Sequence, residues 1–140
     1  MKTRRIVSNF IKNKIIFFVF SMMFILGSCD KESNKNQSKT LIGKWSWIQS
    51  NGGFGGVTNT PQSTGDVITI EFVNNSVYRQ YRNGILSIET TYELKNVEGH
   101  SELFIFYGNG HASIITLLDI DKLILTDYMC DGYVNTYRKK

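Results

Sequence analysis

Few side chains in this sequence of 140 residues carry groups suited to catalysis or metal binding. His100 and His111 are its two histidines, and the cysteines and carboxylates around them lack the spacing of a metal site. Asp119 and Asp121 flank a turn, where short carboxylates favour turn chemistry over general acid–base catalysis. No Ser-His-Asp, paired-carboxylate or phosphate-loop pattern occurs. We therefore predict no catalytic residue, no metal and no cofactor, and we expect each histidine in a turn or at the surface.

The first 28 residues have the three parts of a secretory signal. A cationic segment comes first, and an apolar run, Ile15–Leu26, follows it with Ser21 as its one polar residue. Twelve residues at about 1.5 Å each reach about 18 Å as a helix, short of the roughly 30 Å of a hydrocarbon core. The pattern therefore favours a cleaved signal peptide over a membrane-spanning helix.

The segment Leu26-Gly27-Ser28-Cys29 resembles the lipobox of bacterial lipoproteins. The resemblance implies cleavage between Ser28 and Cys29 and a thioether-linked lipid, usually joined by an N-acyl chain such as palmitate, on Cys29. Two or three acyl chains hold a protein stably on a membrane leaflet, whereas one binds marginally. We therefore expect a lipid-anchored protein of the bacterial cell envelope, on the outer membrane. An ordinary cleaved signal and an uncleaved anchor are the alternatives.

Removing the leader changes the charge of the protein. The full chain has a net charge of +4, but five of its 16 basic residues and none of its 12 acidic residues lie in residues 1–28. Eleven basic and 12 acidic side chains remain, so the mature chain has a net charge of −1. The basic character that would suggest nucleic-acid binding belongs to the leader, and we predict no nucleic-acid partner.

Residues 29–40 comprise the lipidated cysteine and a tether. Asp30–Lys39 contains no apolar residue, which is typical of a disordered linker. The charged start Asp30-Lys31-Glu32 resembles the signal that sends some Gram-negative lipoproteins to the cell surface, so surface and periplasmic display both stay open. With Cys29 lipidated, Cys130 has no disulfide partner, and we expect it to be a small buried side chain beside Met129.

Residues 41–140 predict one all-β domain. Short β-rich segments alternate with turn dipeptides such as Asn83-Gly84 and Asp131-Gly132, which is typical of an antiparallel meander. Short connections make sequence neighbours into sheet neighbours, and closure of the sheet removes its two edges. The predicted strands are Gly43–Gln49, Val67–Val73, Ser76–Arg82, Ile85–Leu94, Glu102–Tyr107, His111–Leu118, Lys122–Asp127 and Tyr133–Lys139.

The motif Leu41-Ile42-Gly43-Lys44-Trp45 resembles the G-x-W opening of the lipocalin (calycin) barrels, and Tyr137-Arg138 resembles the end of their last strand. With the lipobox, the chain is similar to small lipocalin-like lipoproteins of Gram-negative bacteria over about residues 40–140. The resemblance implies an eight-stranded antiparallel up-and-down β-barrel that begins at Gly43. It also implies that Trp45 plugs one end and that Arg138 lies across it in a cation–π contact of about 0.5–2 kcal/mol.

This sequence departs from full-length lipocalins in its shorter strands and in its lack of a C-terminal helix. A short barrel filled by Trp, Phe and Tyr side chains would leave little room for a ligand. The longest connection, residues 50–66, is rich in glycine and small polar residues. By analogy with the first loop of lipocalins, Phe54 and Val57 are candidates for a lid over the open mouth, although a mobile loop with Phe54 packed on the rim is the alternative.

Three predicted strands between Leu103 and Leu125 are apolar on both faces, whereas a barrel strand normally has a polar outer face. Something should therefore cover this outer surface: a second copy of the chain, a protein partner, the membrane or the chain's own loops. The leading prediction is a non-catalytic binding module for a small apolar or amphipathic ligand. The alternative is a structural lipoprotein that docks a partner through this outer face.

Overall fold

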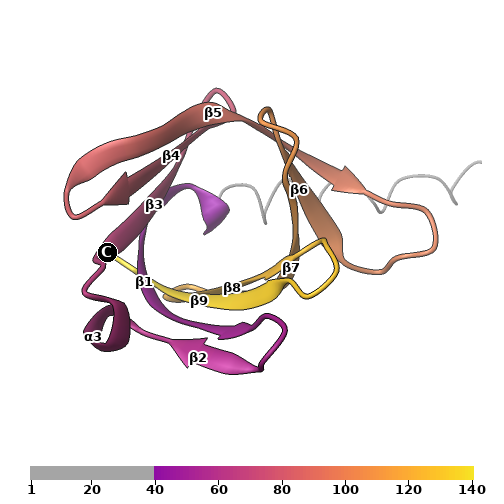
Figure 1. The fold of residues 1–140 in the computed structure, drawn as a ribbon. Helices are drawn as coiled ribbons and strands as arrows, with labels where there is room; N and C mark the ends of the chain where they lie inside the picture. The colour runs from indigo at the N-terminus through magenta and orange to yellow at the C-terminus, as the bar shows by residue number, and fades with distance from the viewer. Residues whose placement is uncertain (1–39) are drawn as a thin grey trace, which may run out of the picture. The chain divides into compact units, whose positions relative to one another are not determined.

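The computed structural model describes residues 40–140, so Ser28, Cys29 and most of the tether lie outside the described residues. Eight antiparallel strands follow one another round a closed ring, and β1 pairs with β9 to complete it (Figure 1). The predicted eight-stranded antiparallel up-and-down barrel is therefore confirmed. The strands of the ring are β1 (Gly43–Gly52), β3 (Ile68–Val73), β4 (Val77–Arg82), β5 (Ile85–Asn96), β6 (Leu103–Tyr107), β7 (Ala112–Leu118), β8 (Lys122–Asp127) and β9 (Tyr133–Lys139).

The turns between these strands follow from residues that tolerate a positive φ. Asn83 and Gly84 have φ values of 54° and 81°, as a two-residue type I′ hairpin requires, and they join β4 to β5. Asp131 has a φ of 55° in the connection from β8 to β9. These tight turns hold the register, so inward-facing side chains of neighbouring strands lie beside one another. Register shifts interrupt this pairing between Trp47 and Gln49, between Gln80 and Tyr81 and between Ile115 and Leu117.

The long connection of residues 50–66 is more ordered than the sequence suggests. β1 continues to Gly52, beyond its predicted end, and a short strand β2 (Val57–Asn59) pairs with Ser50–Gly52. The helical turn α3 (Pro61–Thr64) follows, and the side chain of Thr60 caps it. β2 and α3 lie outside the ring, beside β1 (Figure 1).

The two ends of the barrel differ in how they are filled. The end at the start of β1, which we call the closed end, contains the fully buried side chains Leu41, Trp45, Phe72 and Leu123. The rings of Phe72 and Tyr92 pack edge to face there, with centroids 5.1 Å apart. The opposite end, which we call the open end, lies at the β4–β5, β6–β7 and β8–β9 turns.

The chain's own loops cover part of the apolar outer surface. Phe104 is fully buried although it faces away from the core cluster. Its ring packs edge to face against His100 at 5.0 Å and against Tyr128 at 5.1 Å, both from connecting segments. Of the alternatives for this surface, the structure therefore supports loop cover at Phe104. Leu117 on β7 and Ile120 in the connection from β7 to β8 remain exposed.

Candidate functional site

A cavity of about 650 Å³ occupies the barrel interior towards its open end. The expectation that aromatic side chains would leave little room is therefore wrong. The reason is their distribution, because the fully buried Trp45 and Phe72 gather at the closed end while small residues such as Ser50 and Ser113 face the open half. The cavity is lined by Trp47, Ser50, Ile68, Tyr78, Gln80, Ile88, Phe106, Tyr107, Asn109, Gly110, His111, Ala112, Ser113, Leu125, Asp127, Tyr128, Met129, Asn135 and Tyr137.

A chain of hydrogen bonds runs along one wall of the cavity and joins β1, β9 and β8. The indole N–H of Trp47 donates to Ser50 Oγ at 2.8 Å, and Ser50 Oγ donates to Asn135 Oδ1 at 2.5 Å. Asn135 Nδ2 then donates to Asp127 Oδ1 at 3.0 Å. Because each group orients the next, this wall presents fixed polar atoms to the cavity.

Asp127 ends this chain at the last residue of β8. Its second oxygen, Oδ2, accepts a hydrogen bond from the backbone N–H of Tyr133 at 3.2 Å. Desolvation raises the pKa of the Asp127 carboxyl above its ordinary value, although the hydrogen bonds from Tyr133 and Asn135 oppose the shift. The carboxylate therefore lies in a partly water-excluded environment, where electrostatic interactions are stronger than in bulk water.

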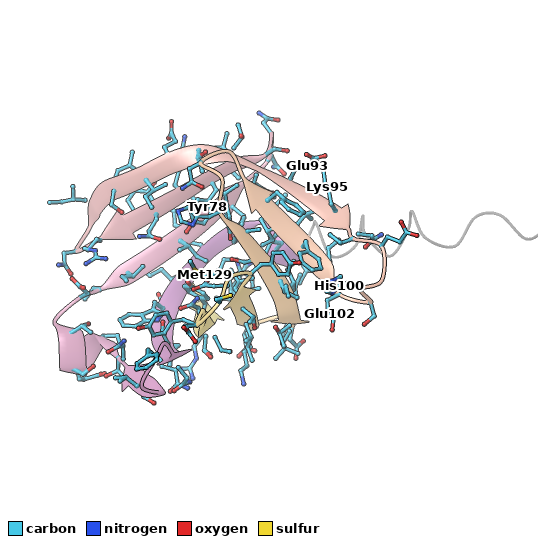
Figure 2. The ribbon with its side chains drawn as sticks, turned by 45° about the vertical axis from the view of Figure 1, so that its right-hand side comes forward. Tyr78, Glu93, Lys95, His100, Glu102 and Met129 are labelled. Carbon is cyan, nitrogen blue, oxygen red and sulfur yellow. The ribbon has the colours of Figure 1, made fainter. Side chains whose placement is uncertain are left out.

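Three tyrosines with raised pKa values form much of the remaining wall: Tyr78, Tyr107 and Tyr137. Burial is the largest cause for each of them, and the charge of Asp127 adds to the rise in all three. Their hydroxyl groups are therefore neutral at physiological pH. The rings of Tyr78 and Tyr107 meet edge to face at 4.8 Å, and Tyr78 points into the interior from β4 (Figure 2).

At the closed end, the residue that lies over Trp45 is Lys139 and not Arg138. The Lys139 ammonium is 4.1 Å from the centroid of the Trp45 ring and donates to the backbone oxygens of Thr40 at 3.0 Å and Ile42 at 2.6 Å. The prediction for Arg138 is wrong by one residue. Tyr137 and Lys139 alternate inward on β9, so Arg138 between them faces solvent.

Gly43 and Trp45 belong to the same arrangement. Gly43 has a φ of 126°, and a Cβ atom there would come within 3.0 Å of Lys139 Nζ. The missing side chain therefore leaves space for the lysine above Trp45. The indole N–H of Trp45 donates to the backbone oxygen of Leu41 at 2.8 Å, so the only polar atom of the buried ring is satisfied.

The predicted lid residues do not cover the cavity. Phe54 is 100% exposed in the turn between β1 and β2, and Val57 at the start of β2 is 53% exposed. Neither lines the cavity, and Phe54 does not pack on the rim either. The physical reason is the pairing of β2 with β1, which holds this hairpin in line with the wall instead of across the mouth. Residues of two other turns, among them His111 and Met129, form the rim, and Figure 2 shows Met129 in the β8–β9 turn.

Other residues with chemical potential are dispersed. Cys130 is exposed, as is Met129, so the expectation of a buried thiol is wrong because the β8–β9 turn projects from the barrel. Both histidines are exposed, with His111 at the cavity rim. Among residues 40–140, no group of three or more His, Cys, Asp or Glu side chains is arranged to hold a metal ion. None of the helices in this described part has the length and apolar character to cross a membrane.

The sequence interpretation missed the polar wall of the cavity. The signal that could have revealed it is the two-residue alternation within strands. Trp47 shares the face of Trp45 on β1, and Asn135 shares the face of Tyr137 on β9. A polar side chain such as Asn135 in an inward position indicates either a buried network or a lined cavity, and here it belongs to both.

Comparison with known proteins adds little beyond the fold. No protein-family model matches the chain, and no curated protein matches its sequence. Among solved structures, a de novo designed fluorescence-activating β-barrel is similar, with 10% sequence identity and a TM-score of 0.43. The match covers 74% of this chain and 96% of the designed chain. The function of this protein therefore has to be argued from its own cavity.

Proposed function

We propose that this protein is a non-catalytic binding module that holds a small amphipathic molecule in the cavity at the open end of its barrel. The single observation that carries the proposal is the cavity itself, because a volume of about 650 Å³ lies within the range of small-molecule sites. Its walls combine aliphatic side chains, aromatic rings and a few fixed polar atoms. That combination suits a ligand with an apolar body and one polar group.

Fluorescence titration with a neutral hydrophobic probe, N-phenyl-1-naphthylamine, tests this proposal. Ser113 is buried on the cavity wall in β7, so Ser113→Phe would place a ring in the cavity. Thr116 lies on the same strand but is exposed, so Thr116→Phe is the matched control. Ala112→Phe, at the rim, is a second blocking variant with less risk to folding.

The wild type and the Thr116→Phe variant should bind the probe in a saturable way, with roughly one site for each chain. The Ser113→Phe and Ala112→Phe variants should bind it at least about tenfold more weakly while they keep the circular dichroism spectrum of the wild type. A wild type that does not bind the probe would contradict the proposal. The proposal would also be contradicted if the Ser113→Phe and Ala112→Phe variants bound the probe as tightly as the wild type.

We further propose that the barrel is displayed on a lipid anchor in the bacterial cell envelope. The support is the sequence alone: the cationic leader, the short apolar run and the small residues before Cys29. Metabolic labelling with a palmitate analogue, followed by membrane fractionation, tests it. Cys29→Ala should lose the label and accumulate unprocessed, whereas Cys130→Ala should be labelled like the wild type. A Cys29→Ala variant that keeps the label would contradict the anchor.

A further inference from the structure

The cavity wall has an unbalanced charge distribution. Asp127 is the one carboxylate among the residues that line the cavity, and these residues include no lysine or arginine within the described chain. The basic side chains lie elsewhere: Arg79 pairs with Glu89 and Arg82 with Asp66 at the surface, while Lys139 lies over Trp45 at the closed end. An anionic ligand would therefore meet a partly desolvated carboxylate, and among the described lining residues only the imidazole of His111, at the rim, could offset that charge.

The geometry of Asp127 leaves it able to bind a ligand group. Each of its oxygens accepts one hydrogen bond, from Asn135 Nδ2 and from the Tyr133 backbone N–H. An ionised carboxylate has about four lone-pair sites, so about two remain for a donor in the cavity. Because both protein donors hold the group in place, a ligand ammonium would meet it already oriented.

The aromatic walls favour the same kind of ligand. Trp47, Tyr78, Tyr107 and Tyr137 all line the cavity, and burial keeps the three tyrosines neutral. Ring faces attract organic cations, and phenol oxygens accept hydrogen bonds from N–H donors. Ile68, Ile88 and Leu125 line the cavity as well and offer contact for an apolar body.

We infer that the cavity selects organic cations, namely amines with an apolar chain or ring, with the ammonium paired to Asp127 and the apolar part packed among the aromatic and aliphatic walls. This inference rests on the proposed function, because it names the ligand class of the same site. It excludes the anions of fatty acids as preferred ligands.

Competition with three ligands of equal chain length tests the inference. Octylamine, octanol and octanoate differ in the head group only, and each can displace N-phenyl-1-naphthylamine at concentrations below micelle formation. At neutral pH we expect octylamine to compete about tenfold better than octanol, because a charged hydrogen bond contributes about 1.5 kcal/mol or more. Octanoate should be the weakest competitor of the three.

Two variants identify the carboxylate responsible. Asp127→Asn should abolish the advantage of octylamine over octanol while octanol still binds, which also reports a folded cavity. Asp131 does not line the cavity, so the Asp131→Asn control should keep the order of the wild type. The order of the three ligands on the wild type is a second measurement that does not depend on any variant.

The possible results separate this inference from the proposed function. If the wild type binds the probe but octanoate competes as well as octylamine, the preference for cations is wrong and the binding function stands. If Asp127→Asn lowers the affinity for all three ligands equally, Asp127 does not recognise the amine and the inference fails. If the probe itself does not bind the wild type, the proposed function fails and this inference fails with it.

Discussion

Two tryptophans on one strand show how differently the two ends of this barrel are built. Trp45 and Trp47 lie two residues apart on β1, and both face inward with a hydrogen-bonded indole N–H. Trp45 donates to the backbone of Leu41, lies beneath the Lys139 ammonium and has no exposed surface. Trp47 donates to Ser50, which belongs to the polar wall of the cavity.

The closed end of the barrel therefore accounts mainly for stability, and the open end accounts mainly for ligand binding. At the closed end, side chains of the core and the C-terminal strand fill the interior, so substitutions there should affect the free energy of unfolding. At the open end, polar atoms are fixed by one another and line the cavity, so substitutions there should affect the affinity for a ligand. A small barrel can hold both because the closed end supplies the packing that the hollow half lacks.

The largest expected effect is from Trp45→Ala. Removing a fully buried tryptophan should lower the free energy of unfolding by about 3–5 kcal/mol. Trp47→Ala should cost less, because the Trp47 ring borders a cavity and is 7% exposed, whereas Trp45 is fully buried. Urea denaturation followed by circular dichroism measures both. A cost for Trp47→Ala equal to or above that for Trp45→Ala would remove the distinction between the ends.

The next largest effect on stability is expected at Lys139, which lies over Trp45 at the closed end. Lys139→Met removes a cation–π contact and two hydrogen bonds to backbone oxygens. Because Lys139 is only partly buried, the substitution should lower the free energy of unfolding by no more than about 1–2 kcal/mol. Arg138→Met, at the exposed neighbouring position, should cause little change. Denaturation midpoints that fall for Arg138→Met but not for Lys139→Met would show that Arg138, and not Lys139, stabilises the closed end.

The affinity of the cavity for octylamine should depend on pH. Desolvation raises the pKa of Asp127, so protonation should remove its charge at a higher pH than for an exposed aspartate. As the pH falls from 7 towards 4, the affinity for octylamine should fall about tenfold, whereas that for octanol should stay nearly constant. Tyr78, Tyr107 and Tyr137 face the same cavity and stay neutral throughout this range.

His111 lies at the rim, and its charge acts on the Asp127 carboxyl, so a positive imidazole there would also weaken amine binding. The titration is therefore repeated in His111→Gln. The same fall in this variant assigns the pH dependence to Asp127. A pH-independent affinity in His111→Gln would contradict the role of the carboxylate.

The smallest effect is expected at Phe54. Its side chain is fully exposed and does not line the cavity, so Phe54→Ser should leave both the free energy of unfolding and the affinity for the neutral probe unchanged. Denaturation and probe titration of this variant check the point. A large loss of affinity would show that the hairpin closes over the ligand after all.

The sequence predicts the barrel well because its signals are local. Turn residues such as Asn83-Gly84 and the two-residue alternation set the strands, and short connections leave few topologies. The resemblance to lipocalins predicts Arg138 over Trp45, whereas the inward alternation of β9 places Lys139 there. The two-residue alternation places Asn135 on the inward face of β9, but its hydrogen bond with Ser50 joins residues 85 positions apart and depends on closure of the ring.

The most direct test of the two-ended account is the fluorescence of single-tryptophan variants. The chain has two tryptophans, so Trp45→Phe leaves Trp47 as the reporter and Trp47→Phe leaves Trp45. We predict that octanol shifts or quenches the emission of Trp47 in a saturable way and leaves that of Trp45 unchanged. An unchanged Trp47 signal, or an equal change at Trp45, would contradict the claim that ligand binds in the open half above a solid closed end.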